Sequence, residues 1–157
     1  HSVLAARDLP HRLVLAGPKG WLSTASSLEH PAAGLEGRVC VAGELTDEQL
    51  VALYSGADLM VLPSRHEGFG LTVLEAMTQG TAVLCSDIPV LREVGGEAAA
   101  YAPVDDAASL GEAMVELLRD DFERERLGEA GKKRAEKFSW RQCVSLTRAV
   151  YREALGG

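Results

Sequence analysis

Five short apolar runs, separated by longer amphipathic segments, constrain the fold of this chain more than any other feature. The runs are Leu13–Ala16, Val39–Ala42, Leu59–Leu62, Ala82–Cys85 and Ala99–Ala102. They are continuously apolar rather than alternating, which is typical of parallel strands covered on both faces. Strands that alternate with helical patterns predict an α/β fold, with a Rossmann-like parallel sheet and right-handed crossovers.

Helices are expected in the gaps between these strands and after the last one. The segments are Ser2–Arg7, Trp21–Glu29, Asp47–Ser55, Leu71–Gln79, Val90–Val94, Ala107–Leu118, Phe122–Lys137 and Trp140–Ala154. Thr46 with Gln49, and Ser139 with Gln142, have the spacing of capping boxes. Gly80 stands where a left-handed residue would end the fourth of these helices. A chain of 157 residues has the length of one domain, and we expect a single domain over residues 1–157 with no linker.

The amino-acid composition argues against some classes of binding partner. A net charge of −7 argues against nucleic acid as a partner, and no apolar run is long enough to span a membrane. The three cysteines, Cys40, Cys85 and Cys143, are expected to be buried free thiols in a reducing, cytoplasmic compartment. Since no Cys-x-x-Cys pair exists, a zinc site is not expected. The chain starts with His1, so an excerpt or a processed piece is expected.

Loops rich in small or polar residues follow four of the predicted strands. They are Gly17–Gly20, Gly43–Leu45, Ser64–Gly68 and Ser86–Asp87. Ligands of open parallel sheets bind outside the carboxyl ends of the strands. The sequence therefore predicts a binding site along the edge where these loops meet.

Two carboxylates, Glu67 and Glu75, stand eight positions apart around the start of a predicted helix. Gly68 and Gly70 lie between them and allow a ligand to approach the backbone closely. The helix N-terminus offers unpaired N–H donors and a positive dipole end, which suit phosphate groups. Carboxylates beside it suit hydroxyl groups. Both features together predict a nucleotide-sugar, which contains a diphosphate and polyols.

This segment resembles the Glu-x7-Glu motif of retaining glycosyltransferases with the two-domain GT-B fold, family 4 in particular. The resemblance covers most of the chain and includes Leu13–Trp21, Val41–Leu50, Ala57–Ser64, Ser86–Val94 and Phe138–Trp140. The Gly-Trp and Ser-Asp-Ile-Pro details look most like mannosyltransferase-type members. The resemblance implies the C-terminal, donor-binding half of such an enzyme.

The resemblance also implies a role for each residue of the site. Glu75 would hold the ribose, and Glu67, at the catalytic position, would lie beside the transferred sugar. Backbone N–H groups and one hydroxyl would bind the sugar and the diphosphate: Gly68, Phe69, Gly70, Leu71 and Thr72. Two further loops would border the base: Gly17, Gly43, Glu44 and Leu45.

Each of these residues also has a purely structural interpretation. Glu75 suits the first turns of a helix through the dipole, and Glu67 fits an ordinary surface loop. Phe69 is expected chiefly to plug the core beneath its loop. The hydroxyl of Thr72 can bond its own backbone, and the glycines of the base-bordering loops can serve turns alone.

The chain departs from the family in two respects. The strand that ends in Gly-Arg, followed by a lysine that neutralises the donor diphosphate, is not found, and neither is the N-terminal acceptor domain. That strand would lie mid-sheet, between the runs that begin at Leu13 and Leu59. Either these two strands close up or something else supplies a strand. The chain alone is therefore expected to transfer sugar poorly or not at all.

The function implied by the resemblance is retaining transfer of a hexosyl group from a GDP- or UDP-sugar to an acceptor hydroxyl, with no cofactor and no metal. The donor phosphate oxygen would take the acceptor's proton in front-face chemistry. The acceptor, a glycan, lipid or small molecule, would bind through the absent half, and peripheral membrane contact stays open. The alternatives are a non-catalytic nucleotide-sugar binding module and half of a sugar-nucleotide epimerase.

Overall fold

The computed structural model describes residues 9–18 and 37–156 and has the predicted α/β architecture. In chain order its elements are β1 (Leu13–Ala16), β2 (Val39–Gly43), α3 (Asp47–Gly56), β3 (Met60–Leu62), α4 (Leu71–Gln79), β4 (Val83–Ser86), α5 (Pro89–Gly95), η1 (Gly96–Ala98), β5 (Ala100–Ala102), α6 (Ala107–Arg119), α7 (Asp121–Ala135) and α8 (Trp140–Ala154). The helices expected over Ser2–Arg7 and Trp21–Glu29 lie outside the described residues.

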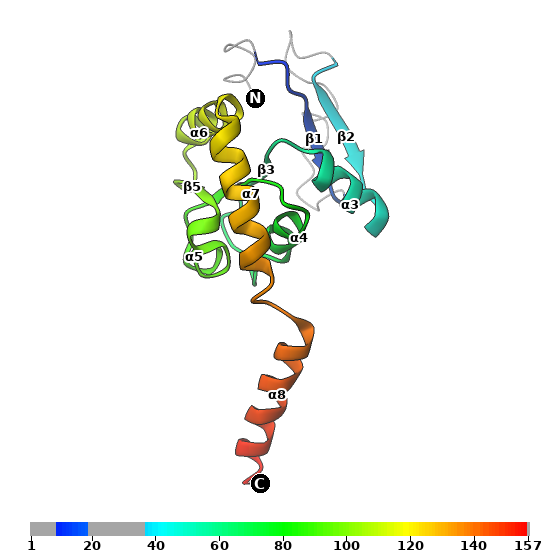
Figure 1. Ribbon diagram of the computed structural model, residues 1–157, viewed down its shortest axis with the longest axis vertical. Helices are drawn as coiled ribbons and strands as arrows, with labels where there is room; N and C mark the ends of the chain where they lie inside the picture. The colour runs from blue at the N-terminus through cyan, green and yellow to red at the C-terminus, as the bar shows by residue number, and fades with distance from the viewer. Residues whose placement is uncertain (1–8, 19–36, 157) are drawn as a thin grey trace.

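The strands form two parallel sheets rather than one. β1 pairs with β2, while β3, β4 and β5 pair in that order. Within the described ranges no strand pairing joins β1 to β3, so these two strands have not closed up. Figure 1 shows β1 and β2 together with α3 on one side of the molecule, and β3 to β5 with the remaining packed helices on the other.

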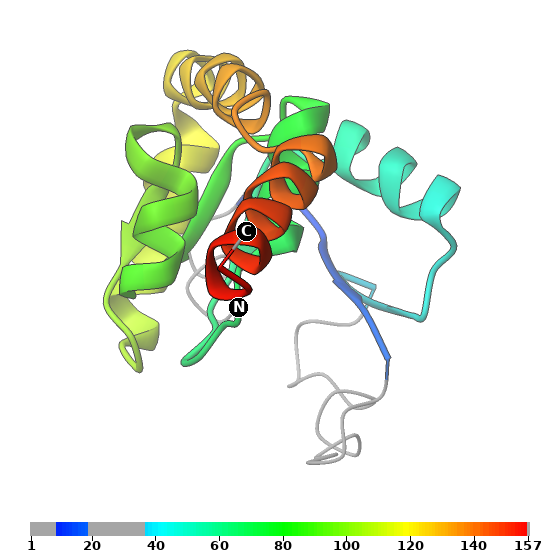
Figure 2. The same cartoon turned by 90° about the horizontal axis from the view of Figure 1, so that it is seen from below.

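The core surrounds β4, which is buried along its whole length because helices cover both of its faces. Val83 and Cys85 point to one face and pack with α4 and α5. Leu84 points to the opposite face and packs with Leu117 of α6 and Leu127 of α7. Figure 2 shows this layered arrangement from below. The fully buried strand predicted from a continuous apolar run is therefore confirmed for β4.

Local signals in the sequence set several helix ends as predicted. The Thr46 hydroxyl accepts from the Gln49 N–H while the Gln49 side chain accepts from the Thr46 N–H, which completes the capping box of α3. Gly80 ends α4 with a φ of 80°, in the left-handed region. Ser139 accepts from the Gln142 N–H at the start of α8. Of these three, only Gly80 belongs to α4, the helix of the candidate site, and it sets the residue at which that helix ends.

Two glycines of α7 let this helix lie directly against α4. A Cβ on Gly128 would overlap the carbonyl oxygen of Gly80, a backbone atom that cannot move freely. A Cβ on Gly131 would lie 3.0 Å from the Cγ and 3.3 Å from the Cβ of Met77, a tight contact without overlap. α4, which begins at the candidate site, is thus supported at its opposite end by a contact between Gly128 and Gly80 that only glycine permits.

We expect Gly128→Ala to lower the free energy of unfolding by about 1–2 kcal/mol. Overpacking destabilises a folded protein by about 1–3 kcal/mol. The higher helix propensity of alanine offsets up to about 1 kcal/mol of that loss. Gly131→Ala, whose Cβ would meet the Met77 side chain at 3.0 Å rather than overlap a backbone oxygen, is the matched comparison and should lose less stability than Gly128→Ala. Urea unfolding of both variants checks this. Equal losses would mean that the contact with Gly80 is not the tight one.

The prediction that all three cysteines are buried is wrong for two of them. Cys85 is buried in β4, but Cys40 and Cys143 are exposed. Cys40 lies in β2, which pairs only with β1 among the described strands. Cys143 lies in α8, which has no buried residue and extends away from the rest of the chain in Figure 1. None of the described helices has the length and apolar character needed to cross a membrane.

Candidate functional site

A cleft of about 800 Å³ separates the two sheets. Val14 and Ala16 of β1 form one wall, the residues of β3 form the other, and α3 covers it. Five of the predicted site residues line this cleft together at the carboxyl ends of the strands: Gly17, Glu44, Leu45, Thr72 and Glu75. The structure therefore brings together the predicted ribose residue, one predicted phosphate residue and most of the predicted base-bordering residues.

Glu75 is the fifth residue of α4, about one turn into the helix as predicted. The hydroxyl of Tyr54, on α3, donates to Glu75 Oε2 at 3.3 Å. Burial, together with the nearby Glu75 charge, raises the pKa of Tyr54 to about 12. The Tyr54 hydroxyl therefore remains protonated at neutral pH and keeps donating. It occupies one oxygen of an exposed carboxylate and leaves acceptor capacity facing the cleft.

The start of α4 presents backbone donors that no side chain caps. Its N-cap is Gly70, with a φ of 90°, and no side-chain hydrogen bond is made there. The N–H of Val73 bonds the Gly70 carbonyl at 3.1 Å. The N–H groups of Leu71 and Thr72, which come before it, have no carbonyl one turn earlier in the helix. They lie next to the cleft that Thr72 lines.

Glu67 is held apart from this cleft. It is partly buried and accepts a 2.6 Å hydrogen bond from the Ser64 hydroxyl. Neither Glu67 nor Gly68, Gly70 or Leu71 contributes to the lining of the cleft. The two carboxylates thus lie four residues before and four residues after the first residue of α4, in different surroundings.

The expectation that Phe69 plugs the core is wrong. Its side chain is 46% exposed. Its ring meets the ring of Phe138 edge-on, with centroids 6.1 Å apart, and Arg134 lies over the Phe138 ring. Phe69 therefore anchors its loop to the segment between α7 and α8 rather than to the sheet.

The loops after β1 and β2 are tied together at the mouth of the cleft. The N–H of Gly17 donates to the carbonyl of Gly43 at 2.8 Å. Gly43 takes a φ of 69°, so its turn requires glycine whatever else it does. Glu44 and Leu45 then follow along the cleft, whereas Gly43 itself does not line it.

Charge in the cleft is divided between its two ends. Glu44 and Glu75 lie at the carboxyl ends of the strands, and His11, Arg12 and Asp58 lie at the opposite end. Arg65, on the loop before α4, is paired with Asp105 at 2.6 Å. In the part of the chain that the structure describes, no group of three or more metal-ligating side chains occurs.

Two residues that hold the predicted carboxylates were not predicted from the sequence. Tyr54 holds Glu75, and Ser64 holds Glu67. The Ser64–Glu67 pair had a visible signal, a hydroxyl residue three positions before an acid. The Tyr54–Glu75 pair had none, because the two residues are 21 positions apart in sequence and meet only when α3 packs beside α4.

The sequence profile of the family described as "Glycosyl transferases group 1" matches residues 2–134. O-antigen chain mannosyltransferase B of Escherichia coli is 36% identical over 140 residues, which are 89% of this chain and 37% of that protein. The chain thus spans just over a third of the length of this curated relative.

Two solved structures share the fold. Sucrose-phosphate synthase from Thermosynechococcus elongatus matches 99% of this chain with a TM-score of 0.81 and 28% identity, over 41% of its own chain. Anabaena Alr3699/HepE, solved in complex with UDP, matches 99% of this chain with a TM-score of 0.76 and 17% identity, over 44% of its own chain. The neighbours are GT-B glycosyltransferases, and the present chain has the fold of a Rossmann-like half of that architecture.

Proposed function

This chain belongs to the group 1 glycosyl transferases, and on that premise we propose that its cleft binds the nucleoside-diphosphate sugar used in retaining hexosyl transfer. One observation carries the proposal. Thr72 and Glu75 of α4 share the mouth of a single cleft with Gly17, Glu44 and Leu45 from the loops after β1 and β2. A nucleotide bound there would have hydrogen-bond donors for its phosphates at the start of α4. Its base would lie against the loops after β1 and β2.

The nucleotide is proposed to lie with its ribose against Glu75. An exposed carboxylate that is held by Tyr54 through one oxygen can accept from two adjacent hydroxyls through its remaining lone pairs. The backbone groups of Gly17, Gly43, Glu44 and Leu45 would then border the base. UDP in the solved Alr3699/HepE complex supports a nucleoside diphosphate as the first ligand to test.

The diphosphate is proposed to lie before the first turn of α4. Its charge would be met by the N–H groups of Leu71 and Thr72, the Thr72 hydroxyl and the positive end of the helix dipole. The backbone of Gly68, Phe69 and Gly70 would continue this set of donors toward the sugar. The proposal uses no metal ion, so nucleotide binding should be the same in EDTA as with added Mg²⁺.

The transferred sugar is proposed to lie near Glu67. The Ser64 hydroxyl fixes one oxygen of this carboxylate, which leaves the other free to orient sugar hydroxyls. The mannosyltransferase relative makes a mannosyl donor the first choice. The acceptor, which we propose to be a glycan, lipid or small molecule, would bind to polypeptide outside these residues, in a cytoplasmic enzyme that touches the membrane at most peripherally.

Thermal unfolding with a panel of nucleotides tests this function. A ligand that binds only the native state at a hundredfold excess over Kd stabilises it by about 2.7 kcal/mol. For a domain of this size that is a rise in Tm of about 5–10 °C. GDP or UDP should give such a rise, and inorganic pyrophosphate much less. If no nucleoside diphosphate raises the Tm at millimolar concentration, the cleft does not bind the donor.

A non-catalytic nucleotide-sugar binding module is the second candidate. It is favoured by one observation: among the described lining residues, no arginine or lysine lies at the nucleotide end of the cleft, since Arg12 is at the other end. We expect the 157-residue chain to bind the donor and to transfer sugar poorly. Transfer by a longer form that contains an acceptor domain would favour the enzyme, and binding without transfer by that form would favour the module.

A further inference from the structure

The loop between β3 and α4, residues 63–70, contains no helix or strand, so contacts with other elements must hold it in place. Arg65 pairs with Asp105, but both side chains are largely exposed, and an exposed ion pair fixes a loop only weakly. Phe69 makes a different kind of contact, because its ring meets the ring of Phe138 edge-on. The placement of this loop therefore depends on what holds Phe138.

Phe138 lies between α7 and α8, is half-buried, and contacts two groups through its ring. The ring planes of Phe69 and Phe138 are inclined at 79°, an edge-on arrangement that aromatic pairs favour. The guanidinium of Arg134, on α7, lies over the Phe138 ring, with its Cζ 5.0 Å from the ring centroid. A cation over the face of an aromatic ring is attracted by the ring's electrons. Arg134 thus helps to orient the ring that anchors the loop.

Arg134 is in turn fixed by the last turn of α5. Its Nε donates to the Val94 carbonyl at 2.9 Å, and its Nη2 donates to the Glu93 carbonyl. Carbonyls at the end of a helix have no partner within it, and the negative end of the helix dipole favours a cation there. A planar guanidinium can donate to two carbonyls while its face covers a ring, whereas an ammonium offers no such plane. The position of Phe138 therefore depends on the shape of the Arg134 side chain as well as on its charge.

α5 also meets the loop directly, one residue further on. A Cβ on Gly70 would lie 2.8 Å from Cδ2 of Leu91, a fully buried residue of α5. Two consecutive residues of the loop are thus held with reference to the same helix, Gly70 by contact and Phe69 through Phe138 and Arg134. Neither Phe138 nor Arg134 lines the cleft, so neither would touch a ligand bound there.

We propose that Phe138 and Arg134 are positioning residues for the sugar donor. They hold Phe69, and with it the backbone N–H groups of the loop, where the second phosphate and the sugar would bind. This role rests on the proposed function, since it needs a nucleoside diphosphate at the start of α4. The ribose and the base would be bound by Glu75 and by the loops after β1 and β2, which Phe138 does not hold. A change at Phe138 should therefore affect the part of the ligand beyond the first phosphate.

Phe138→Leu and Arg134→Lys test this role by calorimetric titration with GDP, UDP, GMP and UMP, run below the unfolding transition of each chain. Both variants should weaken binding of the diphosphates by about tenfold or more, the effect of losing one hydrogen bond to a charged group. GMP and UMP lack the second phosphate and should lose less than about threefold. A defect that loosened the whole fold would weaken both kinds of nucleotide alike. Phe138→Tyr, which keeps the ring, should bind the diphosphates like the parent chain.

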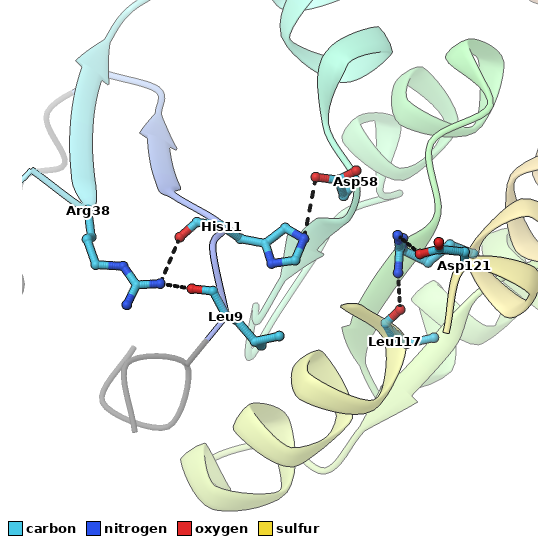
Figure 3. A network of polar contacts seen from close by, with 7 residues as sticks. Leu9, His11, Arg38, Asp58, Leu117 and Asp121 are labelled. Carbon is cyan, nitrogen blue, oxygen red and sulfur yellow. Dashed lines mark hydrogen bonds and ion pairs between the residues drawn. The ribbon is translucent and has the colours of Figure 1, made fainter. Parts of the chain in front are cut away.

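Arg124→Lys is the matched control for Arg134→Lys. Arg124 lies on the same helix, ten positions earlier, roughly 15 Å along its axis. It also donates to a carbonyl in the last turn of a neighbouring helix, that of Leu117 in α6, and it pairs with Asp121. Figure 3 shows both of these partners. The substitution removes the same guanidinium and keeps the charge but does not touch Phe138, so all four nucleotides should bind as they do to the parent chain.

The titrations distinguish failure of the positioning role from failure of the proposed function. Diphosphate affinities like the parent's in Phe138→Leu and Arg134→Lys, equal losses for mono- and diphosphates, or equal losses in Arg124→Lys and Arg134→Lys would overturn the positioning role and leave the donor site in place. If the parent chain itself binds neither GDP nor UDP, the proposed function is wrong and the positioning role is wrong with it. Arg134→Lys leaves every ring in place, so it decides the test if Phe138→Leu does not fold.

Discussion

Replacement of Gly70 by alanine is expected to lower the free energy of unfolding by about 2–5 kcal/mol and to abolish measurable nucleotide binding. Gly70 has a φ of 90° at the N-cap of α4, where a side chain costs about 1–2 kcal/mol. Its Cβ would lie 2.8 Å from Cδ2 of Leu91, which is fully buried in the core. That overlap adds about 1–3 kcal/mol, and relieving it must shift the N–H groups proposed to face the diphosphate.

Gly68→Ala is the matched control for this variant. Gly68 lies in the same loop, but a Cβ there meets nothing within 4 Å and its φ lies outside the left-handed region. Its stability should stay within about 0.5 kcal/mol of the parent chain. Urea unfolding and calorimetric titration with GDP and UDP, run below the transition, separate the two effects. A Gly70→Ala chain that is as stable as Gly68→Ala and binds nucleotide normally would mean that the start of α4 is not placed as described.

Replacement of Glu75 by alanine is expected to weaken nucleoside-diphosphate binding by about 1–3 kcal/mol, or about fivefold to 150-fold in Kd. The loss arises because two ribose hydroxyls lose their acceptor. Stability should change by no more than about 0.5 kcal/mol, since the side chain is exposed and makes one 3.3 Å hydrogen bond in the free chain. The readout is the Kd from calorimetry.

Two further variants distinguish a loss of ribose binding from a general disturbance of α4. Thr78→Ala changes an exposed residue of the same helix whose hydroxyl bonds only the Leu74 carbonyl, and it should bind nucleotide like the parent chain. Tyr54→Phe removes the donor that holds Glu75 but leaves the carboxylate, and it should weaken binding less than Glu75→Ala does. Ligands without a ribose, such as pyrophosphate, should bind all four chains alike. Normal nucleotide affinity in Glu75→Ala would show that the ribose lies elsewhere.

The features that were predicted correctly from the sequence depend on interactions between residues that are close in the chain. The continuous apolar run of β4, the capping box at Thr46 and the left-handed Gly80 each depend on a few neighbouring residues, and all are present in the structure. The position of Glu75 one turn into α4 follows from the same local signals. For these elements, local preference and tertiary packing agree.

What the sequence did not predict depends on contacts between distant residues. By pattern alone Phe69 fits a core position equally well. In the structure its ring instead meets the half-buried ring of Phe138, 69 residues further along the chain. Cys40 lies in a run as apolar as that of Cys85, but β2 has a single strand neighbour in the described ranges whereas β4 has two. The bond from Tyr54 to Glu75 likewise requires two helices to meet.

The central claim is that a nucleoside diphosphate lies against the first turn of α4 at the mouth of the cleft. Titration of the ¹⁵N-labelled chain with GDP and UDP, followed by amide chemical shifts, tests it most directly. The claim predicts saturable shifts that are largest at Gly70, Leu71 and Thr72, accompanied by Gly17 and Glu44, and weakened in Glu75→Ala. Saturable shifts confined to α6 and α7, or no shifts at millimolar nucleotide, would contradict it.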